Sequence, residues 1–292
     1  MATGLVLVLQ AGKCLTEQGA DCSIAIGLAK PIAKDATKWR KSSMLIIEQR
    51  GAVLLLTLDR PEKRNALHPD LIARLTHTLE AAAENPNVNV VLITGAGKSF
   101  CAGLDLGFVL EASFEQKIVY LESVFAMFQR IYTQPQPVIA AINGPAIAGG
   151  FDLSVMCDFR LCSPSAVFAQ TEILLGLTQM IFPLYKIIGL ARAKELAMTG
   201  EVIHSNEAHR IGLVNHVCEA EQLLSSAMSL AETLAARPRQ ALFETKRLTR
   251  ELIDVDTQTA FRRMGKAIRD RLQSEEHTKM AAEFVAQLKQ KN

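Results

Sequence analysis

Two loops rich in small residues are the segments of this sequence best suited to chemistry. One covers 99–106 and the other 143–152, and each follows an apolar stretch typical of a buried strand. Small side chains let a ligand approach the backbone closely, so free amides from the two loops could converge on one oxygen. Such amides stabilise the negative charge that develops on a carbonyl oxygen during a reaction. The alternative is that the glycines serve only tight turns and close helix packing.

Two acidic residues accompany the second loop. Asp152 ends that loop, and Glu172 follows it after two further strand-like stretches. Because Glu172 precedes an apolar run, partial burial would raise its pKa towards the range that suits acid–base catalysis. Two carboxyl groups acting together can handle two protons on one substrate. Taken singly, each acid is more simply interpreted as a helix cap or a surface group.

Other familiar catalytic patterns are missing from the sequence. Gly97-Lys98-Ser99 follows an apolar stretch, but Leu92 stands where a phosphate-binding loop requires a glycine. No G-x-G-x-x-G follows a strand-like stretch, and the histidines form no H-E-x-x-H zinc motif. A G-x-S-x-G nucleophile elbow is also missing. We therefore expect neither nucleotide binding, nor zinc hydrolysis, nor a serine triad.

The composition is that of an ordinary folded chain of 292 residues, and it excludes several classes of function. Lys and Arg total 32 against 30 Asp and Glu, and this balance argues against nucleic acid as a partner. No stretch approaches the run of about 18 apolar residues that a membrane-spanning helix needs. The six cysteines are scattered without a C-x-x-C pair, so we expect reduced thiols and a cytoplasmic location.

Apolar strands that alternate with amphipathic helices must position the two loops. The pattern predicts helices between His68 and Asn85, over 114–132 and over 149–157. The chain after Glu172 is expected to be mostly helical, with Pro238 separating the last two helical stretches. Strands are predicted over 44–49, 53–58, 88–93, 138–142, 159–162 and 167–169. This alternation indicates a layered α/β core.

The same pattern divides the chain into three regions. Residues 1–43 carry no sustained period and are interpreted as an N-terminal extension, with disorder as one interpretation. Residues 44–235 hold the alternating pattern and are expected to form the core. Residues 236–292 are expected to form a helical C-terminal region that serves as a subdomain or an assembly element.

In combination, the motifs resemble those of the crotonase superfamily, the enoyl-CoA hydratase/isomerase family. The resemblance extends from about residue 44 to the C-terminus. It rests on Asp59-Arg60-Pro61 with Asn65-Ala66-Leu67, on 100–106, 143–158 and 171–176, and on the later segment 199–214. It implies a ClpP-like spiral of ββα units with a helical C-terminal trimerisation region. It also implies homotrimers, which often pair into hexamers.

The resemblance further implies a substrate and roles for individual residues. The substrate would be an acyl-CoA thioester, with coenzyme A as part of the substrate and no metal or redox cofactor. The backbone amides of Leu104 and Gly149 would form the oxyanion hole, and Asp152 and Glu172 would be the catalytic acids. The expected substrate contacts are Asn65, Ala66, Leu67, Ala102, Gly103, Asp105, Gly150 and Phe182.

Two departures from the family pattern leave the reaction open. Asp152 stands where hydratases usually have Glu, and 177–183, with the bulky Met180, replaces a glycine-rich helix start. The first expectation is hydration of a trans-2-enoyl-CoA through a thioester enolate. The alternatives are a Δ3,Δ2-enoyl-CoA isomerase, in which Glu172 would shuttle a proton alone, and a non-catalytic acyl-CoA-binding member. Dienoyl isomerases are disfavoured because they carry Asp at the position of Met180.

Overall fold

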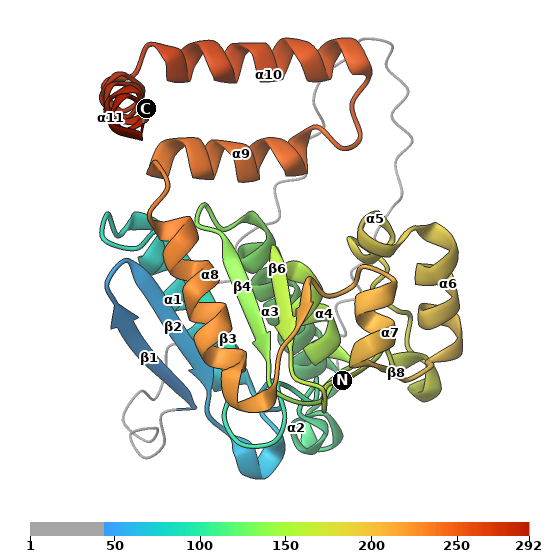
Figure 1. Cartoon of the computed structure of the whole chain (residues 1–292). Helices are drawn as coiled ribbons and strands as arrows, with labels where there is room; N and C mark the ends of the chain where they lie inside the picture. Colours follow the sequence, from blue (N-terminus) through green and yellow to red (C-terminus); the bar gives the residue numbers. More distant parts are fainter. Residues whose placement is uncertain (1–43, 292) are drawn as a thin grey trace, which may run out of the picture. The chain divides into compact units, whose positions relative to one another are not determined.

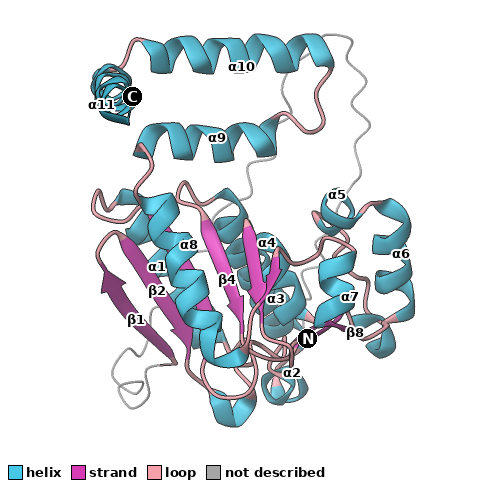
Figure 2. Ribbon diagram, in the orientation of Figure 1, coloured by secondary structure: helices cyan, strands magenta, loops and turns pink. Residues whose placement is uncertain are grey.

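The central sheet of the computed structural model, which describes residues 44–291, has six strands (Figures 1 and 2). The first pair, β1 and β2, is antiparallel, and every later pair in this sheet is parallel. In spatial order the strands are β1 (Leu45–Arg50), β2 (Val53–Leu58), β3 (Val90–Gly95), β4 (Val138–Ile142), β6 (Phe159–Cys162) and β9 (His216–Val217).

Helices cover both faces of this sheet. On one face, Leu54 and Leu56 pack with α1 (Pro69–Glu84) and α3 (Phe114–Thr133) in one apolar cluster. On the other face, the intervening Leu55 packs with α8 (Leu223–Ala235), which Figure 1 shows lying across β3 and β4. Because both faces are buried, the strands read as continuous apolar runs rather than as alternating ones. This confirms the predicted layered α/β core.

A small second sheet lies beside the second loop. It consists of β5 (Ala146–Ile147), β7 (Val167–Ala169) and β8 (Ile203–His204), and β5 pairs parallel with β7. An isolated bridge between Cys101 and Ala146 joins the first loop to the second. The carboxyl end of β7 therefore delivers the chain that carries Glu172 directly alongside the two loops.

Short helices follow the two loops. The first loop leads into α2 (Leu106–Glu111), which begins because the Asp105 side chain accepts a hydrogen bond from the Phe108 amide. The loop predicted over 99–106 is therefore one residue too long, because Leu106 already belongs to α2. The second loop leads into α4 (Gly149–Met156), all of whose residues are buried.

The rest of the chain is mostly helical, as predicted. Pro238 lies between α8 and α9, but three helices follow it rather than one, so the expectation of a single last helical stretch is wrong. Lys246 of α9 ties this region to the core through the Asp158 carboxylate, at 2.6 Å. The remaining helices are α5 (Leu184–Ile188), α6 (Leu190–Thr199), α7 (Ser205–Arg210), α9 (Arg239–Glu251), α10 (Thr257–Leu272) and α11 (Glu275–Lys291).

The predicted boundaries agree closely with the observed elements. The strands β4, β6 and β7 have the predicted bounds, whereas β1 and β3 each begin slightly later than expected. The predicted N-terminal extension, 1–43, lies outside the described residues. Among the helices of 44–291, none combines the length and the apolar content that crossing a membrane requires.

Candidate active site

The two small-residue loops are in direct contact. Gly103 of the first loop has a φ of +87°, a conformation that favours glycine. A Cβ atom added to Gly103 would lie 2.8 Å from the Ala148 Cβ and 2.9 Å from the Gly149 amide nitrogen. Only a glycine fits between the loops at this point. Ala148 itself has a φ of 53°, so the backbone turns sharply just before α4 begins.

Two backbone amides next to this contact have no hydrogen-bond acceptor among the described residues. They belong to Leu104 and Gly149. A Cβ atom added to Gly149 would lie 3.8 Å from the Leu104 amide nitrogen, so the two amides are neighbours. Gly149 is also the first residue of α4, where the helix dipole favours negative charge. The arrangement can hold an anionic oxygen.

Asp152 lies in the first turn of α4, close to these amides. Its side chain is buried, with 6% relative exposure, and its Oδ1 accepts a hydrogen bond from Gln170 Nε2 at 2.9 Å. Burial raises the pKa of Asp152 well above its usual value, and the nearby charge of Glu172 raises it further. The hydrogen bond from Gln170 opposes the rise without reversing it. Asp152 therefore holds a proton more readily than an ordinary aspartate.

Glu172 begins a 3-10 turn (Glu172–Leu175) directly after β7. Burial raises the pKa of Glu172 above its usual value, while hydrogen bonds from backbone amides and from the Gln179 side chain oppose the rise. Its Oε2 atom is buried and has no hydrogen-bond partner among the described residues. Because Gln170, two residues before Glu172, donates a hydrogen bond to Asp152, the structure brings the two predicted acids close together.

A buried polar network holds the first loop in place. Arg60 donates from Nη1 to Asp105 Oδ2 at 2.9 Å and to the Ala66 carbonyl at 2.8 Å. Asn65 is fully buried and donates from Nδ2 to the Ser99 carbonyl at 2.8 Å. The side chains of Asn65 and Asp105, two residues that we expect to contact the substrate, thus support the first loop from inside.

Comparison with known proteins shows the family of this chain. The profile of the family described as enoyl-CoA hydratase/isomerase matches residues 48–291. The chain belongs to this family. A crotonyl-CoA hydratase from Syntrophomonas wolfei is 34% identical over 220 residues, which cover 74% of this chain and 85% of the relative. A short-chain-enoyl-CoA hydratase from Clostridium acetobutylicum is 33% identical over 223 residues, covering 74% and 85% of the two chains.

The fold of the hydratase/isomerase family is found in solved structures as well. An enoyl-CoA hydratase from Bacillus anthracis superposes with a TM-score of 0.82 at 32% identity, covering 84% of this chain and 97% of the other. The expected crotonase fold, with a helical C-terminal region, is therefore confirmed.

The remaining residues expected to contact substrate fall into two groups. The first group lies at or near the first loop: Ala66 accepts from Arg60, the Leu67 amide donates to the Gly103 carbonyl at 2.8 Å, the Ala102 amide donates to the Arg64 carbonyl at 3.0 Å, and Gly150 packs on Cys101. A Cβ atom added to Gly150 would lie 2.1 Å from the Cys101 carbonyl oxygen, so this glycine is needed for packing. Phe182 forms the other group. Its ring is 42% exposed and packs edge-to-face on Tyr132, with centroids 5.3 Å apart.

Several residues of the site were missed by sequence reasoning. Tyr120 of α3 donates from its hydroxyl to the Leu67 carbonyl at 2.5 Å and accepts from the Asp105 amide at 3.0 Å. Gln170 and Gln179 contact the acids. The signal for Gln170 was its place beside Glu172 at the end of a buried strand, whereas nothing in the local sequence pointed to Gln179 or to Tyr120 of α3.

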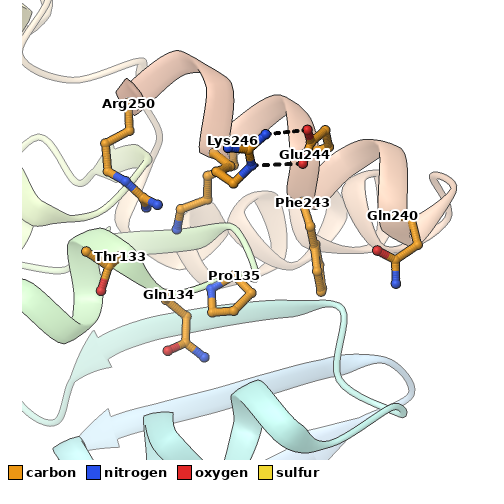
Figure 3. Close-up of a pocket in the computed structure, with 9 residues that line it drawn as sticks. Thr133, Gln134, Pro135, Gln240, Phe243, Glu244, Lys246 and Arg250 are labelled. Carbon is orange, nitrogen blue, oxygen red and sulfur yellow. Dashed lines mark hydrogen bonds and ion pairs between the residues drawn. The ribbon is translucent and has the colours of Figure 1, made fainter. Parts of the chain in front are cut away.

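A separate cavity of about 170 Å³ lies between the end of α3 and α9 (Figure 3). Lys246 and Arg250 extend into this region from α9, and Pro135 closes it from the side of α3. Lys246 is already paired with Asp158, and the Arg250 guanidinium donates to the Tyr132 carbonyl at 3.2 Å. The cavity contains neither of the two acids, so we assign the chemistry to the loop site instead.

Proposed function

We propose that the chain is an enoyl-CoA hydratase that adds water to a trans-2-enoyl-CoA to give the 3-hydroxyacyl-CoA. The observation that supports this most directly is the combination of two unpaired amides with two buried carboxyl groups of raised pKa. The names of the relatives from Syntrophomonas wolfei and Clostridium acetobutylicum point to the same reaction. Coenzyme A enters as part of the substrate, and the proposed reaction uses no metal or redox cofactor.

In the proposed mechanism, the thioester oxygen accepts hydrogen bonds from the amides of Leu104 and Gly149. Negative charge moves onto this oxygen as the conjugated double bond is attacked, and fixed amides stabilise that charge without reorganising. Removing one such donor in other enzymes slows the reaction about 10²- to 10³-fold. The contact between the two loops keeps both donors in place before the substrate arrives.

The two acids divide the proton transfers between them. Two like charges in a buried site disfavour each other, so one carboxyl group is ionised while the other keeps its proton. Asp152 is the more deeply buried of the two and therefore keeps the proton, which leaves Glu172 ionised. Glu172 takes a proton from the water as the water oxygen bonds to C3, and Asp152 supplies its own proton to C2. A proton then returns from Glu172 to Asp152, which restores both acids to their starting states. The net change is the addition of one water molecule.

Isomerisation of a 3-enoyl-CoA is the second candidate. The observation in its favour is that Gln170 already occupies one oxygen of Asp152 and also donates to the Met180 carbonyl, at 2.7 Å. If this contact removes Asp152 from proton transfer, Glu172 alone can move a proton from C2 to C4. A non-catalytic acyl-CoA-binding role is the third candidate, and it requires neither acid.

The absorbance of the conjugated enoyl thioester distinguishes these candidates. A hydratase mixed with crotonyl-CoA lowers the absorbance, and the fall disappears in Glu172→Gln. An isomerase instead produces absorbance from a 3-enoyl-CoA and leaves crotonyl-CoA unchanged. A protein that binds acyl-CoA equally well with and without the Glu172→Gln substitution, and turns over neither substrate, would be non-catalytic.

We further propose that the chain self-associates through its C-terminal helices. Exposed apolar side chains occupy α10 and α11, and contiguous apolar surfaces of this kind mark interfaces. Phe261 is 68% exposed and Phe284 is 62% exposed. The others are Ile268, Leu272, Met280, Val285 and Leu288. Trimers and hexamers are the assemblies that the family resemblance implies.

A further inference from the structure

Three buried oxygen atoms in the active site lack a hydrogen-bond donor among the described residues. They are Gln170 Oε1, Glu172 Oε2 and Gln179 Oε1, and all come from one short segment of chain. A buried oxygen without a donor destabilises the folded protein, so such atoms call for an explanation. Because they accompany the two acids, we interpret them as acceptors for a hydrogen-bearing reactant.

The Gln170 side chain has no donor capacity left for such a reactant. Its amide nitrogen carries two hydrogens, and these go to Asp152 Oδ1 and to the Met180 carbonyl. Gln170 therefore fixes the position of Asp152. Its own orientation is set in turn by the chain around Met180.

Gln179 makes the corresponding contacts for the other acid. Its Nε2 donates to the Gln170 carbonyl at 3.2 Å, and its side chain opposes the rise that burial causes in the pKa of Glu172. Its Oε1, like Glu172 Oε2, is a buried oxygen without a hydrogen-bond donor among the described residues. A water molecule that gives one proton to Glu172 needs an acceptor for its second hydrogen, and Gln179 Oε1 has the capacity to accept it.

Gln179 lies in the segment 177–183, between the 3-10 turn that begins at Glu172 and α5, which begins at Leu184. Its hydrogen bond to the Gln170 carbonyl connects this segment to the chain just before Glu172.

We infer that Gln179 is a positioning residue that orients Glu172 and accepts the second hydrogen of the attacking water. This inference rests on the proposed hydration. A matched set of variants tests it: Gln179→Leu removes both polar atoms at similar volume, Gln179→Asn retracts them by one methylene, and Thr178→Ala alters the exposed neighbour as a control.

The expected result in Gln179→Leu is a fall in kcat of about 10- to 100-fold, the range typical of losing one hydrogen bond to a charged group. The KM for crotonyl-CoA should change far less. Loss of the hydrogen bond also raises the pKa of Glu172, so the acidic limb of the kcat profile should move to higher pH. Thr178→Ala should match the wild type in every respect.

A Gln179→Leu enzyme with wild-type kcat and an unmoved acidic limb would overturn the inference. If the leucine variant does not fold, as judged by thermal melting, Gln179→Asn is read by the same two criteria. A wild-type protein that fails to hydrate crotonyl-CoA and longer enoyl-CoAs would instead refute the proposed function. The two failures are therefore distinguishable.

Discussion

Gly103 and Ala148 lie so close that a methyl group added to Gly103 would come within 2.8 Å of the Ala148 side chain. We predict that Gly103→Ala separates the two loops and lowers kcat/KM at least about 100-fold, since the pair of amides would no longer share one oxygen. Steady-state hydration assays check this.

Gly51→Ala is the matched control for this substitution. Gly51 also has a positive φ, +58°, but nothing lies within 4 Å of an added Cβ atom. The control carries the backbone strain without the clash, so it should lose some stability and keep its activity. Equal losses of activity in both variants would show that strain alone, rather than loop separation, is responsible.

Asp105 makes the stability of the fold sensitive to acid. Burial alone would raise its pKa, but hydrogen bonds from Arg60 and the Phe108 amide outweigh burial and hold the pKa below its usual value. The unfolded chain therefore takes up this proton first as the pH falls. The stabilisation is present above the usual carboxyl range and is lost as the pH falls through the lowered pKa.

We predict that Asp105→Asn weakens the fold by about 3–5 kcal/mol near neutral pH, because it leaves the buried Arg60 without its partner. Below the range in which Asp105 takes up its proton, the variant and the wild type should converge. Urea unfolding at a series of pH values measures this. The exposed pair of Lys266 and Asp270 supplies a control, and Asp270→Asn should leave unfolding unchanged. If the difference in the free energy of unfolding between the variant and the wild type stays constant as the pH becomes acidic, the prediction is contradicted.

We expect Asp152, the acid in α4, to serve catalysis while it lowers the stability of the fold at alkaline pH. The raised pKa of Asp152 means that the native state disfavours its charged form, so this residue contributes stability at low pH and loses it as the pH rises through its pKa. Asp152→Asn keeps the acceptor for Gln170 and removes the charge. We predict a higher melting temperature at alkaline pH together with a loss of hydration of about 10²- to 10⁴-fold. A variant that melts lower at alkaline pH would refute the sign of this effect.

Self-association should depend on the exposed phenylalanines of the C-terminal helices. We predict that Phe261→Asp with Phe284→Asp converts an assembly larger than one chain into single chains, because charges at an apolar interface lose their hydration. Sedimentation velocity measures this directly. Lys266→Gln, on the side of α10 that faces α9, should leave the assembly intact. A wild-type protein that sediments as a monomer would exclude the interface.

Local patterns in the sequence predicted the bounds of helices and strands well, but they did not predict the contacts between these elements. The bounds of β4 were predicted because a continuous apolar run is framed by Pro137 and Asn143. The site depends on pairings across long stretches of chain, such as Arg60 with Asp105 and Gln170 with Asp152. Spacing in the sequence carries no signal for such pairings, so it could not predict that the side chains of Asn65 and Asp105 take part in buried hydrogen bonds.

The ion pair between Lys246 and Asp158 bears on how this protein can be dissected. Asp158 closely follows the end of α4, and its carboxylate also accepts a hydrogen bond from the Val138 amide at 2.7 Å. A fragment that stopped after α8 would leave this carboxylate without its cation, next to the helix that carries Gly149 and Asp152. Truncation where the predicted regions 44–235 and 236–292 meet would therefore destabilise the region that carries the site as well as remove the C-terminal helices.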